Sequence, residues 1–216
     1  MKKLCCAAAI AVVLSGCTPL PTKSLAPEST LQGKHVVLSH YAKPDFAAMT
    51  TGKALFGMIG GFAMVSAGNQ MVKNENIDDP AIEISQRLAS DMAARHASTV
   101  LPVSDTVATD DNPSSLVKTY PGADVILDVR TMYWMYSYYP NKWSRYRVMY
   151  AARVRLIDGK TGALLAQQMC NVEPTDPENA PTHDALRADH AALVKQFLHK
   201  AADRCVSDVE QQALRV

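Results

Sequence analysis

Two stretches in which apolar and polar side chains alternate constrain the fold of this 216-residue chain more than any other feature. They cover residues 125–131 and 147–156. A period of two is typical of β-strands that bury one face. The turn sequence Pro140-Asn141-Lys142 separates the two stretches, and a second turn at residues 158–162 leads into a third stretch at 163–169. The pattern therefore predicts an antiparallel meander that begins with a long hairpin.

Helical spacing marks two further segments. Asp79 and Pro80 provide an N-cap and a first helical residue, and apolar side chains then recur every three or four positions until about His96. The same spacing covers residues 182–211. Short strands are expected at 34–40 and 98–102, with a polar loop at 105–115. Together these elements predict an α+β domain over residues 34–216, with a mainly antiparallel sheet and packed helices.

The N-terminus has the composition of a secretory signal peptide. Lys2 and Lys3 precede an apolar run from Leu4 to Leu14, which is too short to span a bilayer comfortably. Removal of residues 1–16 leaves 20 basic and 21 acidic side chains. A net charge near zero argues against a nucleic-acid partner.

The end of this leader, Leu14-Ser15-Gly16-Cys17, resembles the lipobox of bacterial lipoproteins. The resemblance implies cleavage before Cys17, a diacylglyceryl thioether on its sulfur and an acyl group on its amine. Such multiple acylation gives a stable membrane anchor. Thr18 follows, where an inner-membrane lipoprotein would usually carry aspartate, so we expect the periplasmic side of the outer membrane. The alternatives are a plain secretory leader cut elsewhere and a short N-terminal membrane anchor.

The segment after the predicted lipid anchor contains few side chains that could pack. Residues 18–33 carry three prolines among threonine, serine and lysine, so residues 17–33 are predicted to be the lipidated cysteine and a flexible tether. Two cysteines remain in the domain. Cys170 and Cys205 fit a disulfide in an oxidising compartment, with two buried free thiols as the alternative. The chain has no CxxC motif or Cys/His cluster, so no metal and no cofactor are expected.

Three strings in the chain carry a family resemblance. The strings IDDPAIEISQRLASDMA, ADVILDV and RLIDGKTGALLA resemble segments of envelope lipoproteins related to the curli-secretion lipoprotein and to penicillin-binding-protein activator lipoproteins. GKALFGMIGGFAMVSAGN, the DDPA helix start and PNKWSRYRVMY resemble a group of proteobacterial outer-membrane lipoproteins with no assigned activity. These resemblances imply a fold and a compartment.

A glycine-rich apolar segment, Ala54 to Gln70, is unusual for a soluble domain because no charge lies between Lys53 and Lys73. Gly57 and Gly61 have the GxxxG spacing that lets two helices approach closely, and Gly60 lies beside them. About fifteen apolar residues are fewer than a spanning helix needs. Three interpretations fit: a helix packed on its own domain, a helix that docks on a partner or a second copy, and a segment that contacts the membrane.

The hairpin has an unusual density of aromatic residues, because eight of the chain's fourteen lie between residues 131 and 150. They fall on both faces, so we expect the far end of the hairpin to project and to offer Trp134, Tyr136, Tyr138 and Trp143 to a partner or a glycan. The alternative is cross-strand pairs that only hold the hairpin together. The arginines on the opposite face of the sheet are either solvated, paired with an aspartate, or part of an anion-binding surface. They are Arg130, Arg147, Arg153 and Arg155.

Catalytic motifs are missing from the sequence. It has no GxSxG elbow, no HExxH and no phosphate loop. His183 and His190 are seven residues apart on one predicted helix beside Asp184 and Asp189, a pattern that most often marks a solvated helix face. We therefore expect a non-enzymatic lipoprotein whose periplasmic domain binds a protein partner or itself in envelope assembly or transport. The alternative is a peptidoglycan-binding module that uses the aromatic hairpin.

Overall fold

The computed structural model describes residues 20–27, 31–54, 57–102 and 104–214. The lipobox with Cys17 lies outside these residues. The strands are β1 His35–Leu38, β2 Ala47–Ala48, β3 Thr99–Val100, β4 Val125–Tyr139, β5 Lys142–Asp158 and β6 Leu164–Val172. The helices are α1 Thr51–Ala54, α2 Gly57–Asn74, α3 Pro80–His96, α4 Pro113–Thr119 and α5 His183–Val209, and a π-helical turn follows at Glu210–Leu214.

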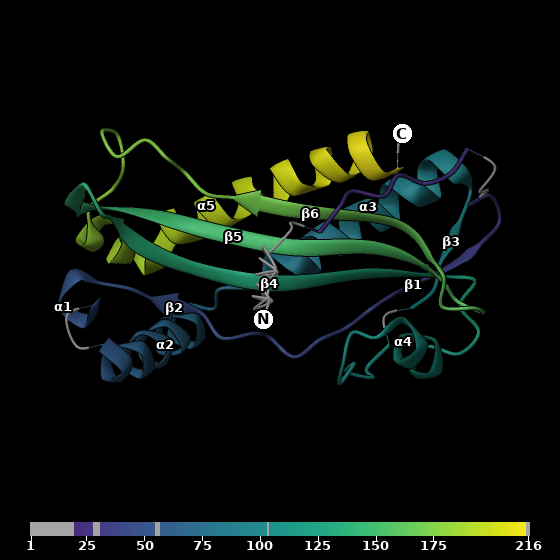
Figure 1. Cartoon of the computed structure of the whole chain (residues 1–216), viewed down its shortest axis with the longest axis horizontal. Coiled ribbons are helices and arrows are strands. Elements are labelled where there is room, and N and C mark those ends of the chain that lie inside the picture. Colours follow the sequence, from purple (N-terminus) through teal and green to yellow (C-terminus); the bar gives the residue numbers. More distant parts are fainter. Residues whose placement is uncertain (1–19, 28–30, 55–56, 103, 215–216) are drawn as a thin grey trace, which may run out of the picture.

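One sheet of order β3-β1-β4-β5-β6 organises the molecule, and β2 pairs with β4 beyond the end of β1. The antiparallel β4–β5–β6 meander forms most of the sheet, whereas β1 and β2 run parallel to β4. Helices α3 and α5 cover one face, and α4 packs near one end of the other (Figure 1). The sequence prediction of an α+β fold with a mainly antiparallel sheet and a long hairpin is confirmed.

Helix α3 has the boundaries that its capping residues predict. The Asp79 carboxylate accepts a hydrogen bond from the backbone N–H of Ala81 at 3.0 Å, and Pro80 is the first helical residue. Ile84, Leu88 and Met92 are fully buried against the sheet. The helix ends at Ala97, which adopts a left-handed conformation with φ of 51°. The four-residue spacing of the three apolar side chains therefore produces the buried stripe.

Helix α5 contains an internal break and a disulfide. Its N-cap is Thr182, whose hydroxyl accepts from the N–H of Ala185 at 3.2 Å. Residues 188–191 are not helical, and three of them have φ near +50°. Cys205, in the second half of the helix, is joined to Cys170 of β6, with the two Cα atoms 5.3 Å apart. The predicted bond is therefore present, and it ties α5 to the sheet.

The described part of the predicted tether is docked on the sheet. Lys23 forms a two-bond antiparallel bridge with Gln167 of β6, at 2.9 and 2.8 Å, and the N–H of Leu25 donates to Ala213 at 2.7 Å. Leu25 and Leu31 are buried in the main core. An edge strand such as β6 leaves backbone groups unpaired, and this segment satisfies part of them. Within residues 20–27 and 31–33, the segment is thus part of the fold.

Three short elements were not predicted from the sequence. They are β2, α1 and α4, and α4 begins at Pro113 inside the predicted loop 105–115. Elements of two to seven residues are too short to produce a detectable period. The parallel pairing of β1 with β4 was also not expected, because α3, β3 and α4 all lie between these strands in the chain.

Candidate functional site

Helix α2 is the candidate surface that the sequence singles out most clearly. It covers most of the glycine-rich segment and packs on β2 through Gly68. A Cβ at Gly68 would lie 1.9 Å from the carbonyl oxygen of Phe46, so only glycine permits this approach. The Asn69 side chain fastens the contact, because it accepts from the N–H of Phe46 at 2.9 Å and donates to Asp45 at 2.7 Å.

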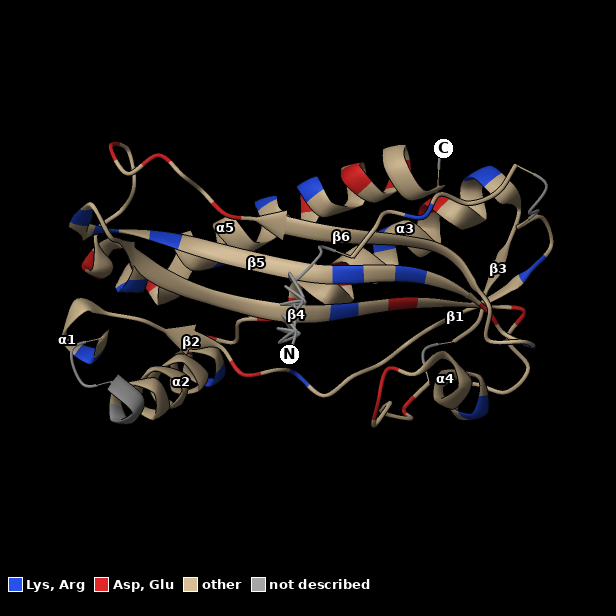
Figure 2. Cartoon of the chain, viewed as in Figure 1, with Lys and Arg blue, Asp and Glu red and all other residues tan. Residues whose placement is uncertain are grey.

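The opposite side of α2, which we call the outer face, consists of Phe62, Ala63, Ser66 and Gln70, all of them exposed. The Phe62 side chain is 79% exposed. Figure 2 shows α2 without charge along most of its length, in contrast to α3 and α5. In Figure 1 the helix lies beside the sheet rather than under α3 and α5. The outer face is therefore an uncharged helix surface with one large exposed hydrophobic side chain, Phe62.

The glycines of the GxxxG pattern lie away from the close contact with β2. Gly57 and Gly61 belong to the N-terminal half of α2, and Gly60 is buried. A Cβ at Gly61 would meet no heavy atom within 4 Å. The fold itself thus requires a small residue at Gly68 but not at Gly61.

Within the described ranges, no helix is long and apolar enough to cross a bilayer.

The aromatic hairpin differs from the prediction that its far end projects. A β-bulge between Thr131 and Tyr133 inserts Met132 and reverses which residues of β4 face α5. Trp134 and Tyr136 are consequently buried, at 1% and 3% exposure, on the same face as Thr131. They cannot offer their rings to a glycan or a partner on the surface of this fold.

The buried rings form a packed aromatic cluster. Phe46, the residue before β2, packs edge-on against Trp134, with ring centroids 5.1 Å apart, and Tyr146 and His183 pack against Tyr136. The Trp134 indole N–H donates to the carbonyl of Pro44 at 3.2 Å. Burial lowers the pKa of His183, which favours the neutral ring that shares a hydrogen bond with the Tyr136 hydroxyl at 3.1 Å. For Trp134 and Tyr136, the structure therefore supports the alternative interpretation, in which the aromatic rings only hold the hairpin together.

Only part of the predicted hairpin surface remains accessible. Trp143 at the tip is 66% exposed, and Tyr138 is half-buried. Arg147 forms an ion pair with Glu173 at 2.8 Å and lies over the ring of Tyr139, 5.1 Å from its centroid. Trp143 is therefore the predicted interaction residue of the hairpin that presents a large free apolar surface.

The arginines on the opposite sheet face are paired with aspartates. Arg155 contacts the fully buried Asp128 through Nε at 2.8 Å, and Arg153 contacts Asp111 at 2.7 Å. Arg130 pairs with Asp111 at 2.6 Å. Burial and the Asp128 carboxylate raise the pKa of Tyr41, whose hydroxyl donates to Asp128 at 2.5 Å. The three arginines share two aspartates, so the network keeps one net positive charge, but each of the three guanidinium groups already has a carboxylate partner.

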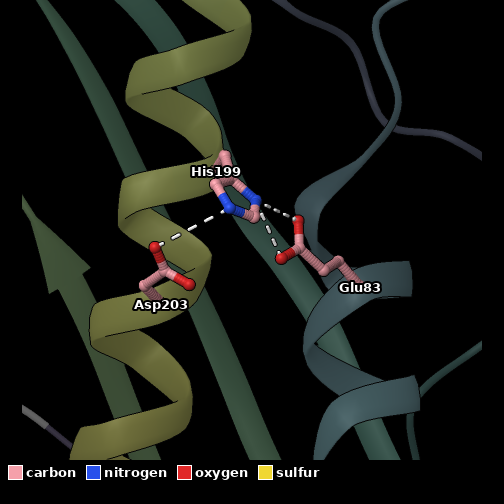
Figure 3. Close-up of side chains that lie close together, drawn as sticks. All are labelled: Glu83, His199 and Asp203. Atoms are coloured by element: carbon pink, nitrogen blue, oxygen red, sulfur yellow. Dashed lines mark hydrogen bonds and ion pairs between the residues drawn. The ribbon is translucent and has the colours of Figure 1, made fainter.

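The histidines of α5 are separated by the helix break. His183 contacts the aromatic cluster, whereas His190 is exposed and pairs with Glu75 at 3.0 Å. A different group, Glu83, His199 and Asp203, places possible metal-ligand atoms within 4.8 Å of one another. Figure 3 shows the His199 ring between the two carboxylates, with Glu83 on α3 and Asp203 on α5. Arg87 donates to both carboxylates, at 3.1 and 2.5 Å. The guanidinium already supplies the positive charge that a metal ion would bring, so the group acts as an ion-pair clamp between α3 and α5.

A cavity of about 710 Å³ beside β4 was not predicted from the sequence. It lies between residues 38–45, the start of α3 with its N-cap, residues 108–109 and residues 129–132 of β4. Its walls come from four segments that are far apart in the sequence, and none of the four has a chemical motif of its own. No signal in a single sequence brings them together.

No protein-family model and no curated protein matches this chain. Solved structures with a similar fold include the LpoB C-terminal domain from Salmonella enterica, at 15% identity over 69% of this chain and 88% of that chain, with a TM-score of 0.33. The PelC dodecamer from Paraburkholderia phytofirmans matches at 13% identity over 89% and 96%, with a TM-score of 0.36. Lipoprotein GNA1162 from Neisseria meningitidis matches at 14% identity over 77% and 99%, with a TM-score of 0.28. All three TM-scores lie below 0.5, and no conclusion about ligand, partner or role follows from these similarities.

Proposed function

We propose that this chain is a lipoprotein held by Cys17 on the periplasmic side of the outer membrane, and that its domain has no catalytic activity and binds another protein through the outer face of α2. The compartment rests on the signal peptide and the lipobox. The binding role rests on the geometry of α2. Trp143 at the hairpin tip provides a second, smaller contact.

The observation that carries the binding role is the outer face of α2, which is exposed and carries no charge. Phe62 is 79% exposed on a helix whose only charged residue is Lys73, in its last turn. Phe62 is the large apolar side chain that this face offers to a partner. Ala63 and Ser66, small residues on the same face, admit the close approach of a second helix. The outer face therefore fits a helix of a partner protein.

The docked N-terminal segment supports a domain held close to the membrane. Five residues separate Cys17 from Lys23, which is bonded to β6. Even fully extended, the six Cα–Cα steps from Cys17 to Lys23 span only about 20 Å. A lipid on Cys17 would thus keep the domain within roughly that distance of the bilayer, which restricts partners to other envelope proteins.

A non-catalytic role is supported by the contacts of the titratable groups. His199 and His190 form ion pairs with carboxylates, and His183 packs in the aromatic cluster. Asp128 and Arg155 neutralise each other in the interior. Each of these groups has a structural partner that accounts for its position.

Metabolic labelling tests the anchor. Cells that express the full chain are grown with radioactive palmitate, and the purified protein is examined for label. We expect label on the wild type and none on Cys17→Ala, with label retained by Ser24→Ala, a change beyond the lipobox. Label that persists in Cys17→Ala would contradict the assignment.

Co-purification tests the binding surface. The tagged, membrane-anchored protein is isolated from solubilised envelopes, and associated proteins are quantified by mass spectrometry. Ala63 lies on the outer face beside Phe62, so a hot-spot contact there predicts that Ala63→Asp lowers the amount of a specific partner about tenfold. The control Lys200→Leu, an exposed change on α5, leaves that amount unchanged. An identical protein profile for wild type and Ala63→Asp would overturn the proposal.

A further inference from the structure

The outer edge of β4 is covered in two separate pieces. β1 pairs with it as far as Leu38 opposite Leu127, and β2 resumes at Ala47 opposite Met135. On the other side, β5 pairs with β4 along almost its whole length. Among the described residues, no strand pairs with the outer edge between positions 128 and 134. This stretch is therefore a gap in an otherwise continuous sheet.

Backbone groups of β4 point into this gap. The carbonyl of Leu127 accepts from the N–H of Ser39 at 3.0 Å, and the N–H of Val129 donates to the Ser39 hydroxyl at 3.3 Å. Backbone groups alternate between the two edges of a strand, so those of Thr131 face the same side as those of Val129. The bulge at Met132 then ends this alternation. Open strand edges of this kind are templates for pairing with another chain.

A cavity adjoins the gap and gives access to it. Residues 39–46 leave the sheet after β1 and return at β2, and Figure 1 shows this connection running away from β4. The space of about 710 Å³ between this connection, α3 and β4 is hereafter called the β4 slot. Its volume lies within the range of protein binding sites. The gap covers seven positions of β4, a length of about 23 Å at the rise of a strand.

The walls of the β4 slot are apolar at the mouth and nearly neutral in charge. Ile82 and Met132 are exposed large hydrophobic residues, at 45% and 46%. Lys43 donates to the carbonyl of Ile77 at 2.9 Å and pairs with Asp78, and Arg130 pairs with Asp111. The two cations thus have partners already. The slot favours an occupant with backbone hydrogen-bonding groups and an apolar side chain over a strongly charged ligand.

One residue that lines the slot has a polar atom without a partner. The Nδ1 atom of His40 is buried and makes no hydrogen bond. A buried polar atom without a partner is uncommon in native proteins and calls for an explanation. A polar group of an occupant beside His40 would provide one, in addition to the backbone pairing with β4.

We propose that the β4 slot binds an extended segment of another protein, about four to six residues long, which adds to β4 as a short strand between β1 and β2 and places an apolar side chain between Ile82 and Met132. The site is separate from the outer face of α2 and does not depend on the lipid anchor. It gives the domain a second mode of recognition, for a peptide rather than for a helix.

A random twelve-residue peptide library displayed on phage is the probe. It is selected on the purified mature protein in detergent, and enriched peptides are then synthesised and titrated. We expect peptides that combine apolar and β-branched residues and whose affinity falls at least tenfold in the double variant Ile82→Asp, Met132→Asp. Both side chains are about half exposed, so the fold should tolerate the change, and thermal unfolding checks this. The control Phe62→Asp, on α2, leaves the affinity unchanged.

Hydrogen exchange locates the bound peptide. A bound strand slows exchange of backbone amides within residues 129–133, while amides of the pairs already present, at 125–127 and 135–136, change little. Several results would overturn the proposal: no enriched peptide, peptides that bind the double variant as tightly as the wild type, or slowed exchange confined to α2. A peptide whose binding is lost only in Phe62→Asp would instead support the α2 surface.

Discussion

The fully buried Asp128 is the residue whose chemistry is most strongly dictated by its surroundings. It accepts from Arg155, Tyr41 and Ser39, so its charge is compensated in the interior. Removal of one partner from a buried ion pair leaves the other charge uncompensated and costs about 3–5 kcal/mol. We expect Asp128→Ala to lower the free energy of unfolding in urea by about that amount.

A substitution in the exposed part of the same network serves as the control that separates the effect of burial from the effect of charge. Arg130 belongs to the same network but is partly exposed, and its partner Asp111 also pairs with Arg153. Exposed ion pairs contribute about 0–1 kcal/mol. Arg130→Ala should therefore cost no more than about 1 kcal/mol in the same urea titration. Equal losses of unfolding free energy in Asp128→Ala and Arg130→Ala would contradict this expectation, because they would show that water screens the charges around Asp128 as well.

His199 couples stability to pH. A hydrogen bond to Glu83, together with the charges of Glu83 and Asp203, raises the pKa of His199 from its ordinary value of 6.5. A folded pKa above the unfolded one stabilises the fold fully below about pH 6.5, and this contribution disappears as pH rises through the folded pKa. We expect His199→Gln to lower the melting temperature at about pH 5.5 and to match the wild type above about pH 8.5. Lys200→Gln on the same helix should show no such pH dependence.

Alanine substitutions at two glycines of α2 should change the stability of the domain in opposite directions. Gly68→Ala would bring a Cβ into the backbone of Phe46, so α2 must separate from β2 and the melting temperature should fall. Overpacking of this kind costs about 1–3 kcal/mol. Gly61→Ala places its Cβ in open space and should stabilise α2 by up to about 1 kcal/mol through helix propensity. A large loss of stability in Gly61→Ala would show that this face is packed against the chain itself.

The break in α5 places non-glycine residues in a left-handed conformation. Asp189 has φ of 50° and is exposed. The left-handed region costs L-residues about 1 kcal/mol or more, a penalty that glycine does not have. Asp189→Gly should therefore raise the free energy of unfolding by about 1 kcal/mol, whereas Lys200→Gly within the regular part of the helix should lower it by about the same amount. Denaturation of both variants in urea provides the comparison, and losses of the same sign would argue for a continuous helix.

Sequence patterns predicted the elements whose signals are local and long. The cap at Asp79, the stripe of α3 and the alternation in β4 and β5 are each repeated over many residues, and the structure agrees with them. Face assignment failed at Trp134 and Tyr136 because a single inserted residue, Met132, reverses the faces of a strand. A bulge has no signature in one sequence, so the burial of these aromatic rings could not be foreseen.

The arrangement of the whole molecule depends on contacts between distant segments, and here sequence reasoning was least informative. The docking of residues 22–25 on β6 satisfies an open edge whose position is known only once the sheet is formed. The β4 slot likewise needs β1, α3 and β4 in place. For the candidate site, the sequence singled out residues 54–70 and Trp143 but left open whether the helix is packed or exposed, and the buried pairing of Arg153 and Arg155 required the structure.

The central claim is that the outer face of α2 binds another protein in the cell envelope. Photo-crosslinking in living cells tests it most directly, with a photoreactive amino acid placed at Phe62 or, as a control outside α2, at Val107, which is 43% exposed. The account predicts a discrete cross-linked product from position 62 that disappears when Ala63→Asp is added on the same face, and no product of that mass from position 107. Absence of any protein cross-link at position 62, or a product that Ala63→Asp leaves unchanged, would contradict it.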